Sequence, residues 1–165
     1  HAIAFAKSED LQDTFVNTSR DGFMLAMNIS CYSLLAAARR AKELMTEGGS
    51  ILTMTYRGSV KVYPGYNVMG VAKAALEASV RYIAYELGEL GIRANAISAG
   101  PVKTLSAKGV KNFTDILDVV REKAPLKRNI SLGDLGGTAV YLLSDLSSGM
   151  TGEVLYVDAG YNTMG

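Results

Sequence analysis

The sequence has 165 residues, of which 48% are apolar, and its formal net charge at pH 7 is +1. A chain of this length and apolar content can bury a real core, so residues 1–165 are predicted to form a single domain. A nearly neutral charge without a basic cluster argues against nucleic-acid binding.

Cysteine usage and hydropathy indicate the setting in which the protein works. Cys31 is the only cysteine, which excludes an internal disulfide, and no cluster of metal-ligating residues predicts a metal site. Both observations favour a reducing, cytoplasmic environment. The longest apolar runs are too short to span a membrane, and no signal peptide is visible.

Residues 1–6 read as the end of a buried strand, in which Ala4 and Ala6 are small enough to let a flat ligand approach. His1 is the only histidine, but nothing in the sequence pairs with it, so a catalytic base at this position is not expected. Residues 7–17 are polar and predict a loop with a short helical turn.

A helix and a strand are predicted next. Thr18 or Ser19 can cap a helix that runs to Met45, because apolar residues then recur at three- and four-residue steps. Glycines 48–49 end this helix. Residues 50–55 are nearly all apolar or β-branched, which is typical of a strand that is covered on both faces.

The second half of the chain continues to alternate between helices and strands. Helices are predicted at residues 66–88, 114–122 and 135–143, and strands at residues 92–98 and 153–158. Such alternation is typical of an α/β fold with a parallel sheet.

Tyr66 and Lys73 form the first candidate catalytic pair. Seven residues are almost two helical turns, so both side chains lie on one face, about 10 Å apart along the axis. A nearby cation favours the phenolate and should bring the tyrosine pKa, ordinarily about 10, towards working pH. Such a pair suits a reaction in which negative charge grows on a substrate oxygen.

A tyrosine and a lysine at this spacing are more often a chance pair on a helix. Three features favour a site here. Tyr56 ends the preceding strand, where open α/β sheets place their sites. The turn residues Gly58, Pro64 and Gly65 let the intervening segment fold back over a crevice, and the regular helix gives Lys73 a rigid support.

The turn that begins at Ala99 is the second candidate motif. It leaves the carboxyl end of a predicted strand, where doubly wound sheets bind cofactors. Gly100 and Pro101 make the turn tight and leave few side-chain obstacles. A Gly-Pro turn alone is weak evidence for a site.

The run from Tyr66 to Tyr82, Tyr-Asn-Val-Met-Gly-Val-Ala-Lys-Ala-Ala-Leu-Glu-Ala-Ser-Val-Arg-Tyr, resembles the catalytic helix of bacterial enoyl-acyl-carrier-protein reductases. These enzymes are a divergent branch of the short-chain dehydrogenase/reductase family. The resemblance extends over residues 1–158. Ordinary short-chain dehydrogenases carry Tyr-x3-Lys, which would place the tyrosine at position 69, where this chain has Met69.

The resemblance implies an oxidoreductase of fatty-acid biosynthesis that reduces a trans-2-enoyl thioester carried on acyl carrier protein. It implies NADH as the cofactor, with NADPH as the alternative. Tyr66 would hydrogen-bond the thioester oxygen, Lys73 would hold the nicotinamide ribose, and Tyr56 would line the substrate side. It also implies a homotetramer with contacts through the helix that ends at Met45 and the helix that begins at Tyr66.

Further site residues follow from the resemblance alone. On the cofactor side it implies Ile3, Ala4, Lys73, Ala99, Gly100, Pro101, Val102 and Thr104. On the substrate side it implies Ala6, Tyr56, Met69, Val110, Phe113 and Ile116. Glycines beside the predicted helix 114–122 suggest a mobile lid over the substrate, although an ordinary amphipathic surface helix fits the same pattern.

No glycine-rich phosphate loop opens a strand-to-helix turn anywhere in the sequence. We therefore expect the C-terminal part of a Rossmann-like, doubly wound parallel sheet, with the N-terminal βαβ phosphate-binding half absent. One sheet edge should then be exposed. The choice between NADH and NADPH would also lie outside the sequence.

Two other functions remain open at this stage. One is a short-chain reductase that acts on a ketone or an enone, which a tyrosine at position 69 would have favoured. The other is a non-catalytic nucleotide-binding relative. The presence of Tyr56, Tyr66, Lys73 and residues 102–104 together argues against the second.

Overall fold

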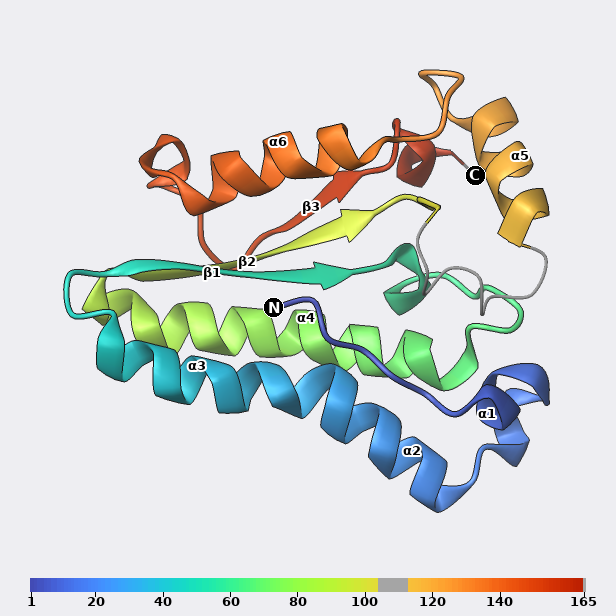
Figure 1. Cartoon of the computed structure of the whole chain (residues 1–165), viewed down its shortest axis with the longest axis horizontal. Helices are drawn as coiled ribbons and strands as arrows, with labels where there is room; N and C mark the ends of the chain where they lie inside the picture. The colour runs from blue at the N-terminus through green and yellow to red at the C-terminus, as the bar shows by residue number, and fades with distance from the viewer. Residues whose placement is uncertain (104–112, 165) are drawn as a thin grey trace.

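A parallel sheet forms the middle layer of the computed structural model, which describes residues 1–103 and 113–164. Within the described residues the strand order is β1-β2-β3. The strands are β1 (Gly49–Thr55), β2 (Ile92–Ala99) and β3 (Val154–Val157). The parallel pairing confirms the predicted fold class, and all three strands point toward the same side in Figure 1.

Helices cover both faces of this sheet, as a doubly wound fold requires. In Figure 1, α3 and α4 lie below the sheet and α6 lies above it. The helices are α1 (Ser8–Gln12), α2 (Arg20–Met27), α3 (Ser33–Leu44), α4 (Asn67–Leu87), α5 (Phe113–Lys123) and α6 (Leu132–Leu143). A π-helical turn, Asn28–Tyr32, joins α2 to α3 without a break.

The core lies between α4, α3 and the sheet. Leu76 and Val80 are fully buried on α4 at four-residue spacing, and Leu34 of α3 and Ile92 of β2 belong to the same buried cluster. The apolar stripe predicted for α4 is therefore its buried side. Because this helix is fixed along its length, the polar side chains on the same face have defined positions.

Helix starts follow their capping residues. Ser19 caps α2, where its hydroxyl accepts a hydrogen bond from the Gly22 N–H at 3.0 Å, as predicted. The predicted start of α6 at residue 135 is wrong, because Ser131 and Asp134 form a reciprocal capping box that begins the helix at Leu132.

Residues 1–6 do not form the predicted strand end. They run beside β1 as an extended segment, and the His1 amino group donates to the Leu52 carbonyl at 2.6 Å. The imidazole nitrogens lie 3.1 Å from Thr53 Oγ1 and 2.8 Å from Ser33 Oγ. The prediction that nothing pairs with His1 is also wrong, since its partners come from elements far along the chain.

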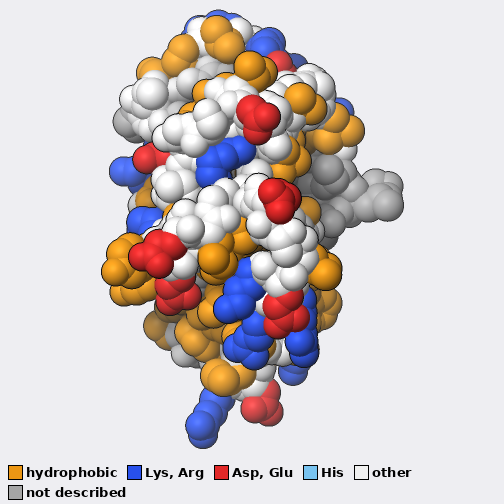
Figure 2. All heavy atoms as spheres, turned by 90° about the vertical axis from the view of Figure 1, so that its left-hand side faces the viewer, with side chains coloured by type: hydrophobic (Ala, Val, Ile, Leu, Met, Phe, Trp, Pro, Cys, Tyr) orange, Lys and Arg blue, Asp and Glu red, His pale blue; other side chains and the backbone are white. Residues whose placement is uncertain are grey.

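Helices α2 and α3, with the π-helical turn between them, form one continuous helix from Arg20 to Leu44. Its length bears on the prediction that no apolar run could span a membrane. By length and composition alone it could cross a membrane, whereas the sequence suggested that no apolar run is long enough. A core helix of a water-soluble protein passes the same test, and Ala26, Leu34 and Ala38 are buried inside this structure. On the face seen in Figure 2, acidic and basic side chains lie beside one another among apolar ones.

Candidate active site

The carboxyl ends of the three strands meet at one edge of the sheet. Thr55 pairs with Ser98, and Ala99 pairs with Val157, so the residues that follow each strand are neighbours. Tyr56 follows β1, and the turn beginning at Gly100 follows β2. The two motifs predicted from the sequence therefore lie at the same edge.

Three tyrosines gather where β1 leads into α4. The ring centroid of Tyr56 lies 5.0 Å from that of Tyr66, at an interplanar angle of 65°, and 5.0 Å from that of Tyr63. The edge-to-face contact between Tyr56 and Tyr66 is a favourable aromatic geometry. The two tyrosines proposed from sequence, ten positions apart in the chain, are thus in direct contact.

The structure corrects the expected ionisation of these tyrosines. Burial, with the Glu77 carboxylate as a second cause, raises the pKa of Tyr66 above the usual value of 10.0. Burial, followed by the neighbouring Tyr63 and Tyr66, also raises the pKa of Tyr56. The prediction that a lysine lowers the Tyr66 pKa is therefore wrong in direction, because desolvation disfavours the phenolate. At neutral pH Tyr66 is a hydrogen-bond donor.

Lys73 is buried, with 7% of its surface exposed, and its ammonium donates to the Met54 carbonyl at 2.9 Å. Burial lowers the pKa of Lys73 to about 8, although Glu77 and Cys31 oppose this change. The side chain is therefore cationic at neutral pH and loses its charge on mild alkalinisation. The hydrogen bond fixes the cation beneath the carboxyl end of β1.

Two glycines allow Tyr66 to sit where it does. A Cβ on Gly58 would overlap the Tyr66 ring, coming within 2.7 Å of Cε1. A Cβ on Gly70 would lie 2.7 Å from the Gly58 carbonyl oxygen. Sequence reasoning named Gly58 only as a turn residue and missed Gly70, because close approach between segments leaves no local pattern.

The turn after β2 is packed tightly against the end of β3. The Gly100 N–H donates to the Val157 carbonyl at 2.8 Å, and a Cβ on Gly100 would lie 2.9 Å from Asp158 Cα. Asp158 is itself buried, and its carboxylate accepts from the Asn162 N–H at 2.8 Å. The predicted Gly-Pro turn is therefore held in place by the C-terminal loop.

Residues 1–6 are tied to the helix layer by a serine that sequence reasoning missed. The Ser30 hydroxyl, in the π-helical turn, accepts from the Phe5 N–H at 2.9 Å and donates to the Phe5 carbonyl at 3.0 Å. The same hydroxyl lies 3.6 Å from the sulfur of Met69, which is buried on α4. Insertions of this type in helices are often found at functional sites.

The remaining predicted site residues have varied surroundings. Ile3 is 56% exposed, Ala4 is also exposed, and Ala6 is half-buried. Val102 and Ile116, predicted on opposite sides of the cleft, pack against the same buried cluster of α5 and the C-terminal loop. Thr104 and Val110 lie outside the described residues, and Phe113 begins α5.

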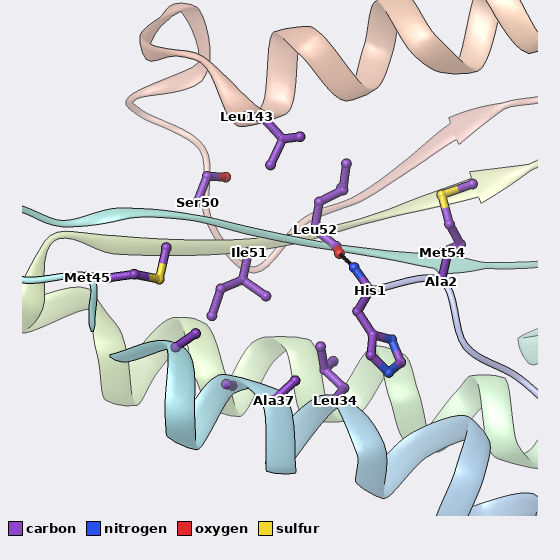
Figure 3. A pocket seen from close by; sticks show the side chains of 12 residues that line it. His1, Ala2, Leu34, Ala37, Met45, Ser50, Ile51, Leu52, Met54 and Leu143 are labelled. Atoms are coloured by element: carbon purple, nitrogen blue, oxygen red, sulfur yellow. Dashed lines mark hydrogen bonds between the residues drawn. The ribbon is translucent and has the colours of Figure 1, made fainter. Parts of the chain in front are cut away.

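One cavity lined by described residues includes a candidate catalytic group, and a second lies elsewhere along the sheet. A cavity of about 470 Å³ is lined by Tyr66, Gly58, Gly70 and Phe15, among others. The other, of about 410 Å³, lies along β1 and contains neither Tyr66 nor Lys73. Figure 3 shows this second cavity, with His1 bonded to the Leu52 carbonyl and its imidazole directed toward the helix that carries Leu34.

An open parallel sheet with its polar groups at the carboxyl edge is the arrangement of nucleotide-binding α/β enzymes. A family model described as "Enoyl-(Acyl carrier protein) reductase" matches residues 1–162, so the chain belongs to that family. This confirms the resemblance based on the Tyr66–Lys73 run.

Individual relatives agree with this assignment. The chain is 60% identical over 165 residues to the NADH-dependent enoyl-[acyl-carrier-protein] reductase FabI of Bacillus cereus, and it is 58% identical over 164 residues to the NADPH-dependent FabI of Staphylococcus aureus. The two alignments include 100% and 99% of this chain, respectively. The chain spans 64% of the length of each relative.

A crystal structure of the Bacillus cereus enzyme with NADP+ and an indole naphthyridinone superposes with a TM-score of 0.98. The alignment covers 100% of this chain and 64% of that one, at 60% identity. The predicted Rossmann-like fold class is therefore confirmed.

Substituting Gly58 by alanine should displace Tyr66, because the new methyl group would occupy the space of its ring. We expect the folded protein to lose about 1–3 kcal/mol of stability, as in other overpacked sites. The near-ultraviolet circular dichroism of the tyrosines should change as well. Gly88→Ala is the matched control, since a Cβ there meets nothing within 4 Å. An unchanged tyrosine spectrum in Gly58→Ala would contradict the assigned packing.

The lowered pKa of Lys73 predicts a defined pH dependence of stability. Between pH 8 and 10.5 the unfolded chain keeps the lysine proton that the folded chain has lost, so the wild type should gain stability as the pH rises. Relative to Lys73→Met, this gain should approach about 1.4 kcal/mol per pH unit. Urea unfolding across this range measures it. A difference that stays constant with pH would show that the lysine is not desolvated.

Proposed function

We propose that the protein is an enoyl-acyl-carrier-protein reductase. It would reduce the trans-2 double bond of an acyl thioester with a nicotinamide cofactor in fatty-acid biosynthesis. The single observation that supports this most strongly is the placement of Tyr66 against Tyr56, with Lys73 fixed two turns along the same helix. The family assignment of residues 1–162 gives this geometry its substrate class.

The residues at the sheet edge fit a nicotinamide nucleotide. An ammonium carries three N–H donors, and one described hydrogen bond, to Met54, uses a single donor of Lys73. Two donors therefore remain for the vicinal hydroxyls of a ribose. Ile3, Ala4 and the turn from Ala99 to Val102 would supply small or apolar walls, and Thr104 follows two residues after Val102. When bound, the reduced cofactor would supply the hydride.

Tyr66 has the protonation state that the reaction needs. Reduction at the β-carbon of an enoyl thioester leaves negative charge on the carbonyl oxygen. A protonated phenol can donate a hydrogen bond to that oxygen as the charge develops, and burial keeps Tyr66 protonated. The same desolvation strengthens the bond, because it forms in a medium of low dielectric.

Tyr56 and the apolar residues around it would line the acyl side of the site. The Tyr56 ring contacts Tyr66 directly, and Ile116 packs against the same buried cluster as Val102. Ala6, Met69, Val110 and Phe113 complete the proposed acyl-binding surface. The residues before α5, for which the sequence suggested a lid, lie outside the described residues.

NADH is the proposed cofactor, with NADPH as the alternative, because relatives with similar identity are named for each. A ketone-reducing enzyme of the same scaffold is less well supported. In that class the tyrosine stands four residues before the lysine, and here that position is the buried Met69.

We further propose that the protein works in the cytoplasm as a homotetramer. Tyr82 and Tyr85 are 71% and 84% exposed on the outer face of α4, and Met24 of α2 is also exposed. Large exposed apolar side chains on these two helices support subunit contacts through them. Sedimentation equilibrium measures the oligomeric state of the full-length protein. Here full-length means this chain joined to the part that its relatives have and it does not cover. A monomer would contradict the proposal.

The activity is tested in the full-length protein by following oxidation of NADH, and separately NADPH, with a short trans-2-enoyl thioester. Oxidation should require the thioester. Tyr66→Phe should lower kcat by about 100-fold or more, as when one oxyanion donor is removed, with little change in cofactor affinity. Tyr156→Phe, at the exposed position of the otherwise half-buried strand β3, is the matched control.

Lys73→Ala should raise the cofactor dissociation constant by about tenfold or more, since charged hydrogen bonds contribute about 1.5–3 kcal/mol. Titration calorimetry measures this value. Unchanged affinity would rule out the ribose role. Cofactor binding without any oxidation by the wild type would instead favour the non-catalytic relative.

A further inference from the structure

Glu77 is a buried ionisable residue that the proposed chemistry does not use. Its side chain lies on α4, one helical turn beyond Lys73, and only 7% of its surface is exposed. The Thr55 hydroxyl donates to Glu77 Oε1 at 2.6 Å. A carboxylate is costly to remove from water, so its presence at this position calls for a physical explanation.

The hydrogen bond from Thr55 does not by itself require a carboxylate. A glutamine at position 77 could accept the same bond through its amide oxygen without the cost of burying a charge. Among the described residues, no cation lies within 4.0 Å of a Glu77 oxygen, so a direct ion pair does not explain the charge either. What a glutamine would lack is the electric field of the anion.

Lys73 lies one helical turn from Glu77 on α4, within reach of that field. Successive turns of α4 bond to successive residues of β1: Lys73 to the Met54 carbonyl and Glu77 to the Thr55 hydroxyl. Both charged side chains are therefore held at fixed positions in the same buried layer. Opposite charges in a buried layer of low dielectric interact more strongly than the same charges in water.

We propose that Glu77 is a positioning residue for Lys73: its carboxylate, oriented by Thr55, is the internal counter-charge that keeps the Lys73 ammonium protonated beneath the cofactor site. The role of that ammonium in cofactor binding rests on the proposed function. The counter-charge itself rests on the geometry of α4 and β1.

The neighbouring titratable groups agree with this assignment. Burial is the main influence on Lys73 and lowers its pKa to about 8, while Glu77 is the larger of the two opposing influences and Cys31 is the smaller. Glu77 also raises the pKa of Tyr66. His1 is hydrogen-bonded to Thr53 of β1, which stands two residues before Thr55. One carboxylate thus helps to keep both candidate catalytic groups in their protonated forms.

The test compares wild type, Glu77→Gln and Glu86→Gln in the full-length protein. Glu86 lies on the exposed face of the same helix and serves as the matched control. Two quantities are measured against pH: kcat/KM for the cofactor, and the rate at which trace acetic anhydride labels Lys73, quantified by mass spectrometry. The labelling rate reports the lysine ionisation without requiring turnover.

Glu77→Gln should lower the midpoint of both profiles by about one pH unit, the effect of removing a nearby opposite charge. Glu86→Gln should leave them unchanged. A labelling midpoint in folded Glu77→Gln equal to that of the wild type would overturn the inference. Circular dichroism and Tm establish that each variant is folded.

Thr55→Val supplies a second test if Glu77→Gln does not fold. This variant keeps the carboxylate but removes the hydrogen bond that orients it. Its labelling midpoint should therefore lie below that of the wild type, by less than the shift of about one pH unit expected when the charge is removed. A midpoint equal to that of the wild type would refute the orienting role. If the wild type reduces no enoyl thioester, the proposed function fails, while the labelling result still decides the inference.

Discussion

The hydrogen bond from the Lys73 ammonium to the Met54 carbonyl joins the middle of α4 to the carboxyl end of β1. It requires a long side chain to cross the helix–sheet interface with its charge buried, which is costly unless the surroundings compensate. The compensation comes from the two elements that the bond connects. β1 provides the carbonyl and α4 provides Glu77. The site therefore depends on how firmly α4 packs on the sheet.

That packing also determines the state of Tyr66. The residue stands at the start of α4, so the same buried stripe that includes Leu76 fixes its backbone. Gly58 and Gly70 let the segment after β1 come close enough to hold the ring against Tyr56. Desolvation then has opposite effects on the two groups. It keeps the phenol protonated, and it brings the lysine closer to losing its proton.

Much of this was predictable from the sequence because the signals are local. The stripe of α4, the apolar strands and the Gly-Pro turn each follow from residues close together in the chain. The Tyr66–Lys73 spacing also carried the family resemblance. Features that depend on contacts between distant segments were missed. They include the partners of His1, the π-helical turn that aims Ser30 at Phe5, and the bond between Thr55 and Glu77. The predicted direction of the Tyr66 pKa shift was wrong for the same reason, since the burial of a side chain depends on the whole fold.

The central claim is that Tyr66 donates to the substrate oxygen while Lys73 holds the cofactor ribose. A crystal structure of the full-length protein with NAD and a bound enoyl thioester analogue tests it most directly. The account predicts that Tyr66 Oη lies about 2.7–3.1 Å from the thioester oxygen, and that Lys73 Nζ bonds to a ribose hydroxyl while retaining Met54. A thioester oxygen bonded elsewhere, with Tyr66 outside hydrogen-bonding distance, would contradict it.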